Sequence, residues 1–330
     1  MHLLKRSIFL LLAIGLLIFA LKDVSFGSLV QQFRQANYTL IALVGLVMII
    51  SYLLRGKRWQ LQLQALGYQP TVLRTTVAMQ TGMIASMIIL GSGELTRCIT
   101  LQRTDGVPVA QGIGSAVAER IIDIFMLMLV LLLTSILEFE RVQSYVQQLT
   151  FRVPSTYITI STLVALVVFA IVAKWIFTSQ RFRSHPLVIK LLSVLDGFSR
   201  GFMTIRKVPQ LALFILLTIL IQVSVWLSTY LMLMSLESTV SLPPTAALTI
   251  LATSSIGGLA VPTQSGIGTF HFLVSRVLVL YGFSSAEGAI VATFIHTIGF
   301  SINLILSSLS FLILPLLIVK PNTHEPERIK

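Results

Sequence analysis

Five ionisable residues stand out against an otherwise apolar sequence. Glu94 and Arg97 follow a glycine-rich break, whereas Glu119, Arg120 and Asp123 lie within a later apolar segment. On a helix, residues three and four apart share a face, so the second group presents both signs of charge together. A guanidinium binds phosphate through paired hydrogen bonds, so we expect Arg97 and Arg120 to bind a phosphate group.

The acidic members of this set, Glu94, Glu119 and Asp123, have three open roles. They can orient the arginines, receive a cationic group, or carry a coupling proton. A structural alternative stands beside these roles, in which the charges only form a salt-bridge network that locks two segments together.

Two glycine-rich breaks supply the second candidate feature. In the first, Gly91 and Gly93 are expected to allow positive φ and close backbone approach. In the second, Gly266 and Gly268 do the same, with Thr269 as the expected helix N-cap. Two helix N-termini meeting inside the molecule would favour an anion. The alternative is a pair of tight packing turns.

His296 is the remaining candidate site residue, and it lies in an otherwise uncharged apolar segment with Asn303 two turns further on. It is expected either to pack as a hydrogen-bonding residue or to relay protons. His271 and Arg276 are weaker candidates. The sequence contains no pattern typical of a nucleophile with its base or of a metal site, so we expect no enzymatic activity and no cofactor. A single cysteine, Cys98, excludes internal disulfides.

The composition indicates an integral membrane protein. Hydrophobic residues make up 55% of the chain and charged residues 11%, and the mean hydropathy is +0.90, whereas soluble domains carry about 25% charged residues. Several apolar stretches approach or exceed the roughly 20 residues that cross a membrane as helix, and the alternation of barrel strands is absent. We therefore predict an all-α, polytopic helical bundle that forms a single domain over 1–330.

About six helices are expected to cross the membrane fully. The first is interpreted as a retained helix that ends near Leu21, and the others cover 38–54, 111–137, 157–177, 210–236 and 286–317. The apolar segments 75–90 and 244–261 are shorter or interrupted by polar residues. Each of them ends at one of the glycine-rich breaks.

Basic residues predict which loops are cytoplasmic. The loops 55–74 and 178–209 are strongly basic, so both should lie inside. A full crossing by 75–90 would put the second loop outside. We therefore predict that 75–105 and 244–281 are re-entrant helical hairpins that enter from opposite sides, with both termini cytoplasmic.

The predicted elements occur twice, as helix, hairpin, helix over about 38–137 and again over 210–317, joined by helix 157–177 and the basic loop. The segments GVPVAQGIGSAVAER (106–120) and GFSSAEGAIVATFIH (282–296) are weakly similar. Because the two units start on opposite sides, they form inverted repeats. Such repeats with broken helices are typical of transporters whose site lies near the membrane midplane.

Two blocks also give the chain a resemblance to a known family. GSGELTR (91–97) with the downstream ERIID (119–123), and PTQSGIGTF (262–270), resemble motifs of the lysylphosphatidylglycerol synthase transmembrane region family, over nearly the whole chain. The resemblance implies a flippase-like domain of a bacterial plasma or inner membrane, here without the soluble lysyl-transferase domain. Gln264 and Ser265 replace the commoner Pro-Gly, and His271 replaces a common acid.

Two functions follow from these observations. The first is a lipid translocase that moves an anionic or phosphate-bearing lipid, with aminoacylated phospholipids and polyprenyl-linked lipids both open, through a polar cavity at the midplane. The second is a non-transporting partner or scaffold of a lipid- or glycan-modifying enzyme. The net charge of +12 is explained by topology and by attraction to anionic lipids at the cytoplasmic face. Nucleic-acid binding is not expected, because the basic residues are spread over membrane-adjacent loops.

Overall fold

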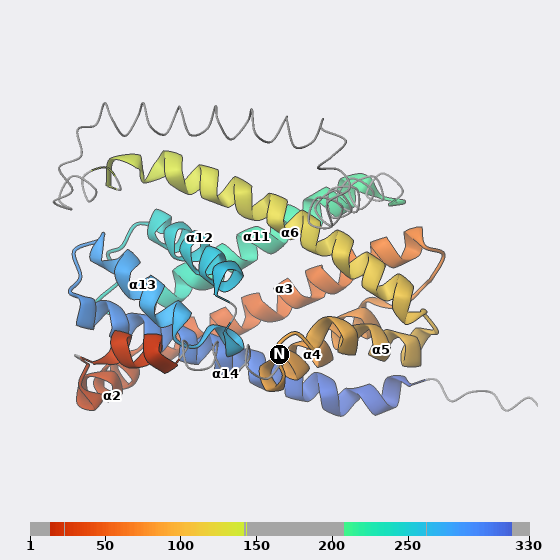
Figure 1. The fold of residues 1–330 in the computed structure, drawn as a ribbon, viewed down its shortest axis with the longest axis horizontal. Helices are drawn as coiled ribbons and strands as arrows, with labels where there is room; N and C mark the ends of the chain where they lie inside the picture. The colour runs from red at the N-terminus through yellow and green to blue at the C-terminus, as the bar shows by residue number, and fades with distance from the viewer. Residues whose placement is uncertain (1–13, 23, 142, 144–207, 262, 319–330) are drawn as a thin grey trace, which may run out of the picture.

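The structure is a computed structural model that describes residues 14–22, 24–141, 143, 208–261 and 263–318. The predicted helix 157–177, almost all of the basic loop 178–209 and both terminal tails lie outside the described residues. Within the described residues every regular element is a helix (Figure 1). The elements are α2 (Phe26–Gln35), α3 (Tyr38–Ala65), α4 (Val72–Ile88), α5 (Gly93–Asp105), α6 (Val109–Leu137), α11 (Leu211–Met234), α12 (Pro244–Ala260), the 3₁₀ turn η1 (Gln264–Gly266), α13 (Thr269–Val279) and α14 (Ser285–Leu317).

The long helices identify a multi-pass membrane protein. Four helices of the described chain, α3, α6, α11 and α14, are long and apolar enough to cross a membrane, and a fifth span results if Ile14–Leu21 and α2, bent by 83°, count as one. Large apolar side chains on these helices are exposed, among them Phe125, Leu132, Ile215 and Leu312. In water such a surface would be a liability, but in lipid it is the expected outer face.

The predicted loop 55–74 is wrong over its first half, because α3 continues to Ala65. Trp59 and Leu63 are fully buried against Ala78 of α4 and Leu101 of α5. Burial of this face stabilises the helix where the sequence is basic, so α3 continues past residue 54. At 28 residues, α3 is about 42 Å long, longer than the roughly 30 Å of hydrocarbon. The connection to α4 is correspondingly short.

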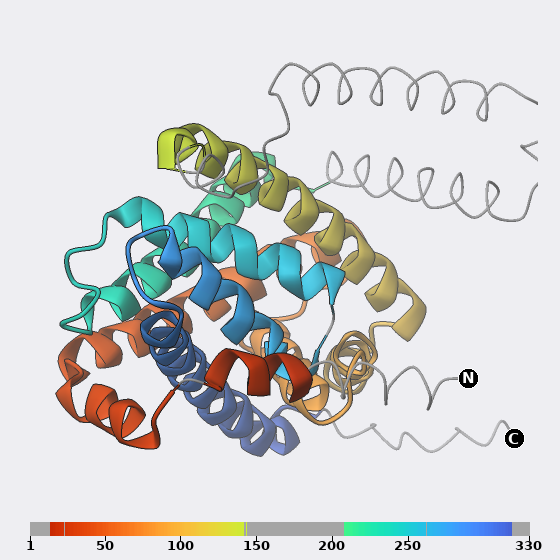
Figure 2. The same cartoon turned by 60° about the vertical axis from the view of Figure 1, so that its left-hand side comes forward.

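Each segment predicted to form a hairpin folds as two helices that pack against each other, α4 with α5 and α12 with α13. The open end of the first is tied by Arg74 Nη1 and Asp105 Oδ1 at 3.1 Å. The open end of the second is tied by the hydroxyls of Thr249 and Tyr281 at 2.9 Å. Figure 2 shows α12 and α13 running side by side. The chain therefore reverses direction at each of the two breaks.

The two hairpins lie toward opposite ends of the molecule and meet at their tips (Figure 1). Near the end of α4, the carbonyl of Met87 accepts a hydrogen bond from the side chain of Gln264 in η1. Other contacts also come in matching sets: α3 packs on α4 as α11 packs on α12, α5 on α6 as α13 on α14, and α4 on α14 as α12 on α6. The helices α3 and α11 pack on each other between the two sets.

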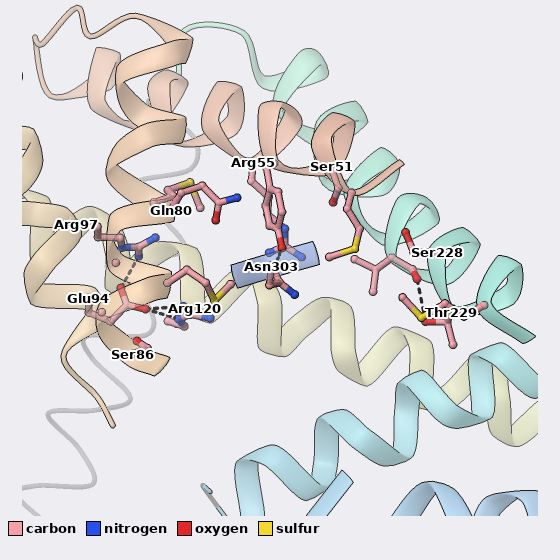
Figure 3. Close-up of a pocket in the computed structure, with 18 residues that line it drawn as sticks. Ser51, Arg55, Gln80, Ser86, Glu94, Arg97, Arg120, Ser228, Thr229 and Asn303 are labelled. Atoms are coloured by element: carbon pink, nitrogen blue, oxygen red, sulfur yellow. Dashed lines mark hydrogen bonds and ion pairs between the residues drawn. The ribbon is translucent and has the colours of Figure 1, made fainter. Parts of the chain in front are cut away.

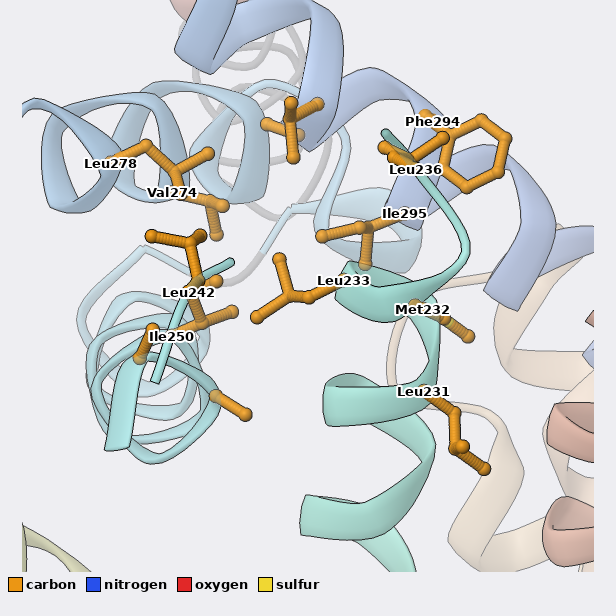
Figure 4. Packing of buried hydrophobic residues seen from close by; sticks show 14 of the residues in the cluster. Leu231, Met232, Leu233, Leu236, Leu242, Ile250, Val274, Leu278, Phe294 and Ile295 are labelled. Atoms are coloured by element: carbon orange, nitrogen blue, oxygen red, sulfur yellow. The ribbon is translucent and has the colours of Figure 1, made fainter. Parts of the chain in front are cut away.

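The largest hydrophobic cluster supports the second hairpin. It joins the end of α11 to α12, α13 and α14, with Leu233, Leu278 and Phe294 completely buried at its centre (Figure 4). The first hairpin has a much smaller apolar core around Trp59 and Leu101. Buried charges occupy the space beside that core.

Candidate functional site

Three arginines and three acids from α3, α5 and α6 form a closed ring of ion pairs. Each arginine contacts two of the acids, and each acid contacts two of the arginines. In order around the ring the residues are Arg58, Glu119, Arg97, Glu94, Arg120 and Asp123. We call this set the charge ring. It contains all five charges singled out from the sequence, together with Arg58.

One half of the charge ring is buried. Arg58 Nη2 donates to Glu119 Oε1 at 2.9 Å and to Asp123 Oδ1 at 2.8 Å. Arg97 Nη1 donates to Glu119 Oε2 at 2.7 Å, and its guanidinium carbon lies 4.8 Å from the centre of the Trp59 ring. The side chains of Arg58 and Glu119 are only 1% and 3% exposed. This half fixes α3, α5 and α6 to one another.

The other half of the charge ring is accessible. Glu94 Oε1 accepts from Arg120 Nε at 3.0 Å and from Arg120 Nη2 at 2.5 Å. Glu94 Oε2 lies 2.6 Å from Arg97 Nη2, a close ion pair without hydrogen-bond alignment. Asp123 Oδ2 is 3.6 Å from Arg120 Nη1. Because the side chains of Arg120 and Glu94 are 60% and 42% exposed, this half can meet a ligand.

A cavity of about 400 Å³ adjoins the accessible half and is lined from α3, α4, α5, α6, α11 and α14 (Figure 3). In the part of the chain that the structure describes, its charged lining is Arg55, Arg97 and Arg120 against Glu94 alone. Uncharged polar groups also face it, including those of Ser51, Gln80, Ser228 and Asn303, and so do four methionines, Met48, Met79, Met83 and Met232. The lining therefore combines positive charge with flexible apolar surface.

The first glycine-rich break behaves as predicted at one of its two glycines. Gly91 has φ of 81°, which an L-residue rarely adopts. Gly93 does not have positive φ, so that part of the prediction is wrong, because Gly93 is already the first residue of α5. Its close backbone approach is confirmed: a Cβ there would lie 2.6 Å from the Gly82 carbonyl oxygen and 2.1 Å from Ser86 Oγ. Gly93 also lines the cavity.

The second break has positive φ at Gly266 (78°) and Gly268 (80°). The expected capping role of Thr269 is wrong, because the N-cap is Gly268 and Thr269 is the first helical residue. The left-handed turn at Gly268 starts the helix without a side-chain cap. The Thr269 hydroxyl instead lies 3.3 Å from the hydroxyl of Thr263. These residues do not line the cavity.

His296 lies against this second break rather than beside the charge ring. Its Nε2 is 2.9 Å from the Ser265 carbonyl oxygen, and its ring centre is 4.7 Å from that of His271. The contacts match the packed, hydrogen-bonding role expected of it. Asn303, on the same helix, lies at the cavity and accepts a hydrogen bond from Tyr52.

Sequence reasoning missed Arg55 and Arg58 as site residues. Both were assigned to a cytoplasmic loop because of their charge, whereas both lie on α3, one in the cavity wall and the other in the charge ring. Trp59 and Leu63, four residues apart, could have signalled the continuing helix, since residues at that spacing lie on one helical face. Gln80, another residue not singled out, is buried and faces the same cavity.

Comparison with known proteins gives a family. The family model described as lysylphosphatidylglycerol synthase TM region matches residues 7–307. That range includes the charge ring, the cavity and both glycine-rich breaks. No curated protein and no solved structure gave a match to the chain.

Proposed function

We propose that this chain, which belongs to the lysylphosphatidylglycerol synthase TM region family, is a lipid translocase that carries an anionic, phosphate-bearing headgroup through the cavity. The observation that carries the proposal is the lining, three arginines and one glutamate beside methionines and uncharged polar groups in about 400 Å³. Guanidinium groups suit phosphate. The acyl or isoprenoid chains of the lipid would stay in the bilayer.

The proposal includes two re-entrant hairpins in inverted repeats. The tie between Arg74 and Asp105 supports a first hairpin that returns to the side it left. The tip contact between Gln264 and Met87 supports entry of the two hairpins from opposite sides. The matching helix contacts support an internal symmetry that relates the unit α3 to α6 to the unit α11 to α14.

Close packing at equivalent glycines adds further support for the repeat. In the alignment of the two units, Gly112 corresponds to Gly288. A Cβ on Gly112 would lie 3.1 Å from Cys98 Cβ of α5, and one on Gly288 would lie 2.7 Å from the Ser275 carbonyl oxygen of α13. In both units a glycine thus lets the last helix, α6 or α14, pack closely against the hairpin of its own unit.

A transport cycle can be stated on this framework. Rocking of one unit against the other, around the contact between α3 and α11, would expose the cavity to each leaflet in turn. We place both termini in the cytoplasm of a bacterial plasma or inner membrane, with anionic lipids at the cytoplasmic face. We also propose that the chain is a single domain over 1–330 and catalyses no covalent reaction.

The second candidate function is a non-transporting partner of a lipid- or glycan-modifying enzyme. The closed charge ring favours it, because every carboxylate oxygen of the ring lies beside a guanidinium and no ligand is needed to satisfy it. In that case the charges hold helices together and the cavity stays unused.

Reconstitution distinguishes the two functions. Fluorescent phosphatidylglycerol is followed by chemical quenching in liposomes that contain the wild type, Arg120→Gln, or the control Arg103→Gln, whose side chain is exposed on α5 outside the cavity lining. The translocase predicts quenching of inner-leaflet lipid with the wild type and control and a clear slowing with Arg120→Gln. Rates equal to protein-free liposomes in all three samples would favour the non-transporting partner.

A further inference from the structure

Arg55 differs from the other arginines at the cavity. It is half-buried on α3 and lines the cavity, yet it forms no hydrogen bond or ion pair with any residue in the described part of the chain. Arg58, one turn further along the same helix, has two carboxylate partners. A guanidinium inside a membrane protein normally has a partner, because removing it from water is costly.

The charge ring gives Arg55 no hydrogen bond or ion pair, although Asp123 and Glu119 attract it from a greater distance. Its three carboxylates, Glu94, Glu119 and Asp123, have every oxygen beside a guanidinium of the ring. Three positive and three negative groups leave the ring neutral. Adding Arg55 leaves one positive charge that the surrounding described residues do not balance.

We infer that Arg55 is the residue that binds the lipid phosphate, and that the cavity accepts a headgroup of net charge −1, a phosphodiester without a balancing cation. The inference rests on the proposed function and narrows its substrate class. One anionic phosphodiester neutralises the one uncompensated guanidinium. A zwitterionic headgroup would bring an additional ammonium group.

The cavity offers that ammonium group no good position. Among the described residues, Glu94 is the one acid in its lining, and both of its carboxylate oxygens are already paired with Arg97 and Arg120. A cationic headgroup would therefore have to break the charge ring. The uncharged groups of Ser51 and Gln80 can bind headgroup hydroxyls or ester oxygens without changing the charge balance. An aminoacylated, net cationic phospholipid is thus a poor fit.

Binding of soluble, short-chain lipids tests the inference separately from transport. Titration calorimetry on the full-length protein in uncharged detergent would use dioctanoyl phosphatidylglycerol (net −1), dioctanoyl phosphatidylcholine (net 0) and dioctanoyl lysyl-phosphatidylglycerol (net +1). The proteins would be the wild type, Arg55→Gln, Arg55→Lys and the control Arg103→Gln. Elution volume and melting temperature would verify that each variant is folded, which is expected because Arg55 forms no hydrogen bond or ion pair with a described residue.

The wild type and Arg103→Gln should bind phosphatidylglycerol more tightly than the other two lipids. Arg55→Gln should weaken that binding about 10- to 100-fold, the range for losing a charged hydrogen bond, and Arg55→Lys should fall between them. Equal binding by folded wild type and Arg55→Gln, or wild-type preference for either of the other lipids, would overturn this inference and leave translocation standing. No wild-type binding of any of the three lipids would overturn the inference, whereas no transport of bound phosphatidylglycerol would overturn only the translocase.

Discussion

Arg58 and Arg55 lie one turn apart on α3 and differ in what surrounds them. Arg58 is 1% exposed and donates to Glu119 and Asp123, whereas Arg55 has no such partner among the described residues. Removing one member of a buried ion pair leaves the other charge uncompensated, which costs about 3–5 kcal/mol. Arg58→Gln should therefore lower the free energy of unfolding by about that amount.

Arg55→Gln serves as the matched variant, since it removes the same charge from the same helix and should leave stability nearly unchanged. Both are measured by denaturant-induced unfolding in detergent micelles, with Arg103→Gln as the surface control. If Arg55→Gln lowers the free energy of unfolding as much as Arg58→Gln does, the two arginines have equivalent environments and the described difference is wrong.

Closure of the charge ring gives a second prediction at the residue scale. Glu119 pairs with both Arg58 and Arg97, so Glu119→Gln should destabilise by about 3–5 kcal/mol. In the double variant Arg58→Gln, Glu119→Gln, the combined loss should be smaller than the sum by about 0.5–3 kcal/mol, because both changes remove the same contact. Additive losses in this double-mutant cycle would contradict direct coupling. Glu140→Gln, at an exposed position just after the end of α6, is the control.

The sequence allowed five of the six ring members to be predicted from residue type and spacing, since buried charges in an apolar segment need partners. Arg58 could not be found in this way. Its charge also fits a cytoplasmic loop, and only the packing of Trp59 and Leu63 against α4 and α5 decides in favour of helix. Which acid meets which arginine depends on how α3, α5 and α6 pack, and local spacing carries no information about that.

The first hairpin depends on backbone contact between its two helices. A Cβ on Gly93 would lie 2.6 Å from the Gly82 carbonyl oxygen, and such overpacking costs about 1–3 kcal/mol. Gly93→Ala should therefore lower the melting temperature and displace Glu94 from Arg120. Gly114→Ala is the matched control, because a Cβ at Gly114 would have no atom within 4 Å. A melting temperature for Gly93→Ala equal to that of Gly114→Ala would contradict the packing described.

Element boundaries were predicted closely where glycine or proline breaks the apolar pattern. The helices α12 (Pro244–Ala260) and α14 (Ser285–Leu317) begin and end within a residue or two of the predicted 244–261 and 286–317. The prediction for α3 was wrong by eleven residues, from 54 to Ala65, because basic residues were treated as a boundary signal. Tertiary burial of one helical face overrode that signal.

At the scale of the molecule, apolar composition was sufficient to predict a helical membrane protein, whereas the side of each loop stays a prediction. Cys98 is buried, so a Cys98→Ala background allows single cysteines to be labelled with membrane-impermeant reagents. Gln69→Cys precedes the first hairpin and Gln102→Cys lies near the end of its second helix, both at exposed positions, and Ser241→Cys lies before the second hairpin. The re-entrant topology predicts that the first two react only from the cytoplasmic side and the third only from outside.

Labelling of Gln69→Cys and Gln102→Cys from opposite sides would rule out a re-entrant first hairpin. Labelling of all three from one side would rule out the inverted arrangement of the two units. The same proteins labelled after detergent solubilisation provide the control for reactivity of each cysteine.

The central claim is that the cavity beside the charge ring carries an anionic lipid headgroup across the membrane. The most direct measurement is the ratio of translocation rates for phosphatidylglycerol and phosphatidylcholine in one set of proteoliposomes, with wild type, Arg55→Gln and Arg103→Gln at equal protein density. We predict faster movement of phosphatidylglycerol by the wild type and Arg103→Gln, and loss of that preference in Arg55→Gln. A wild type that moves neither lipid faster than protein-free liposomes would contradict the claim.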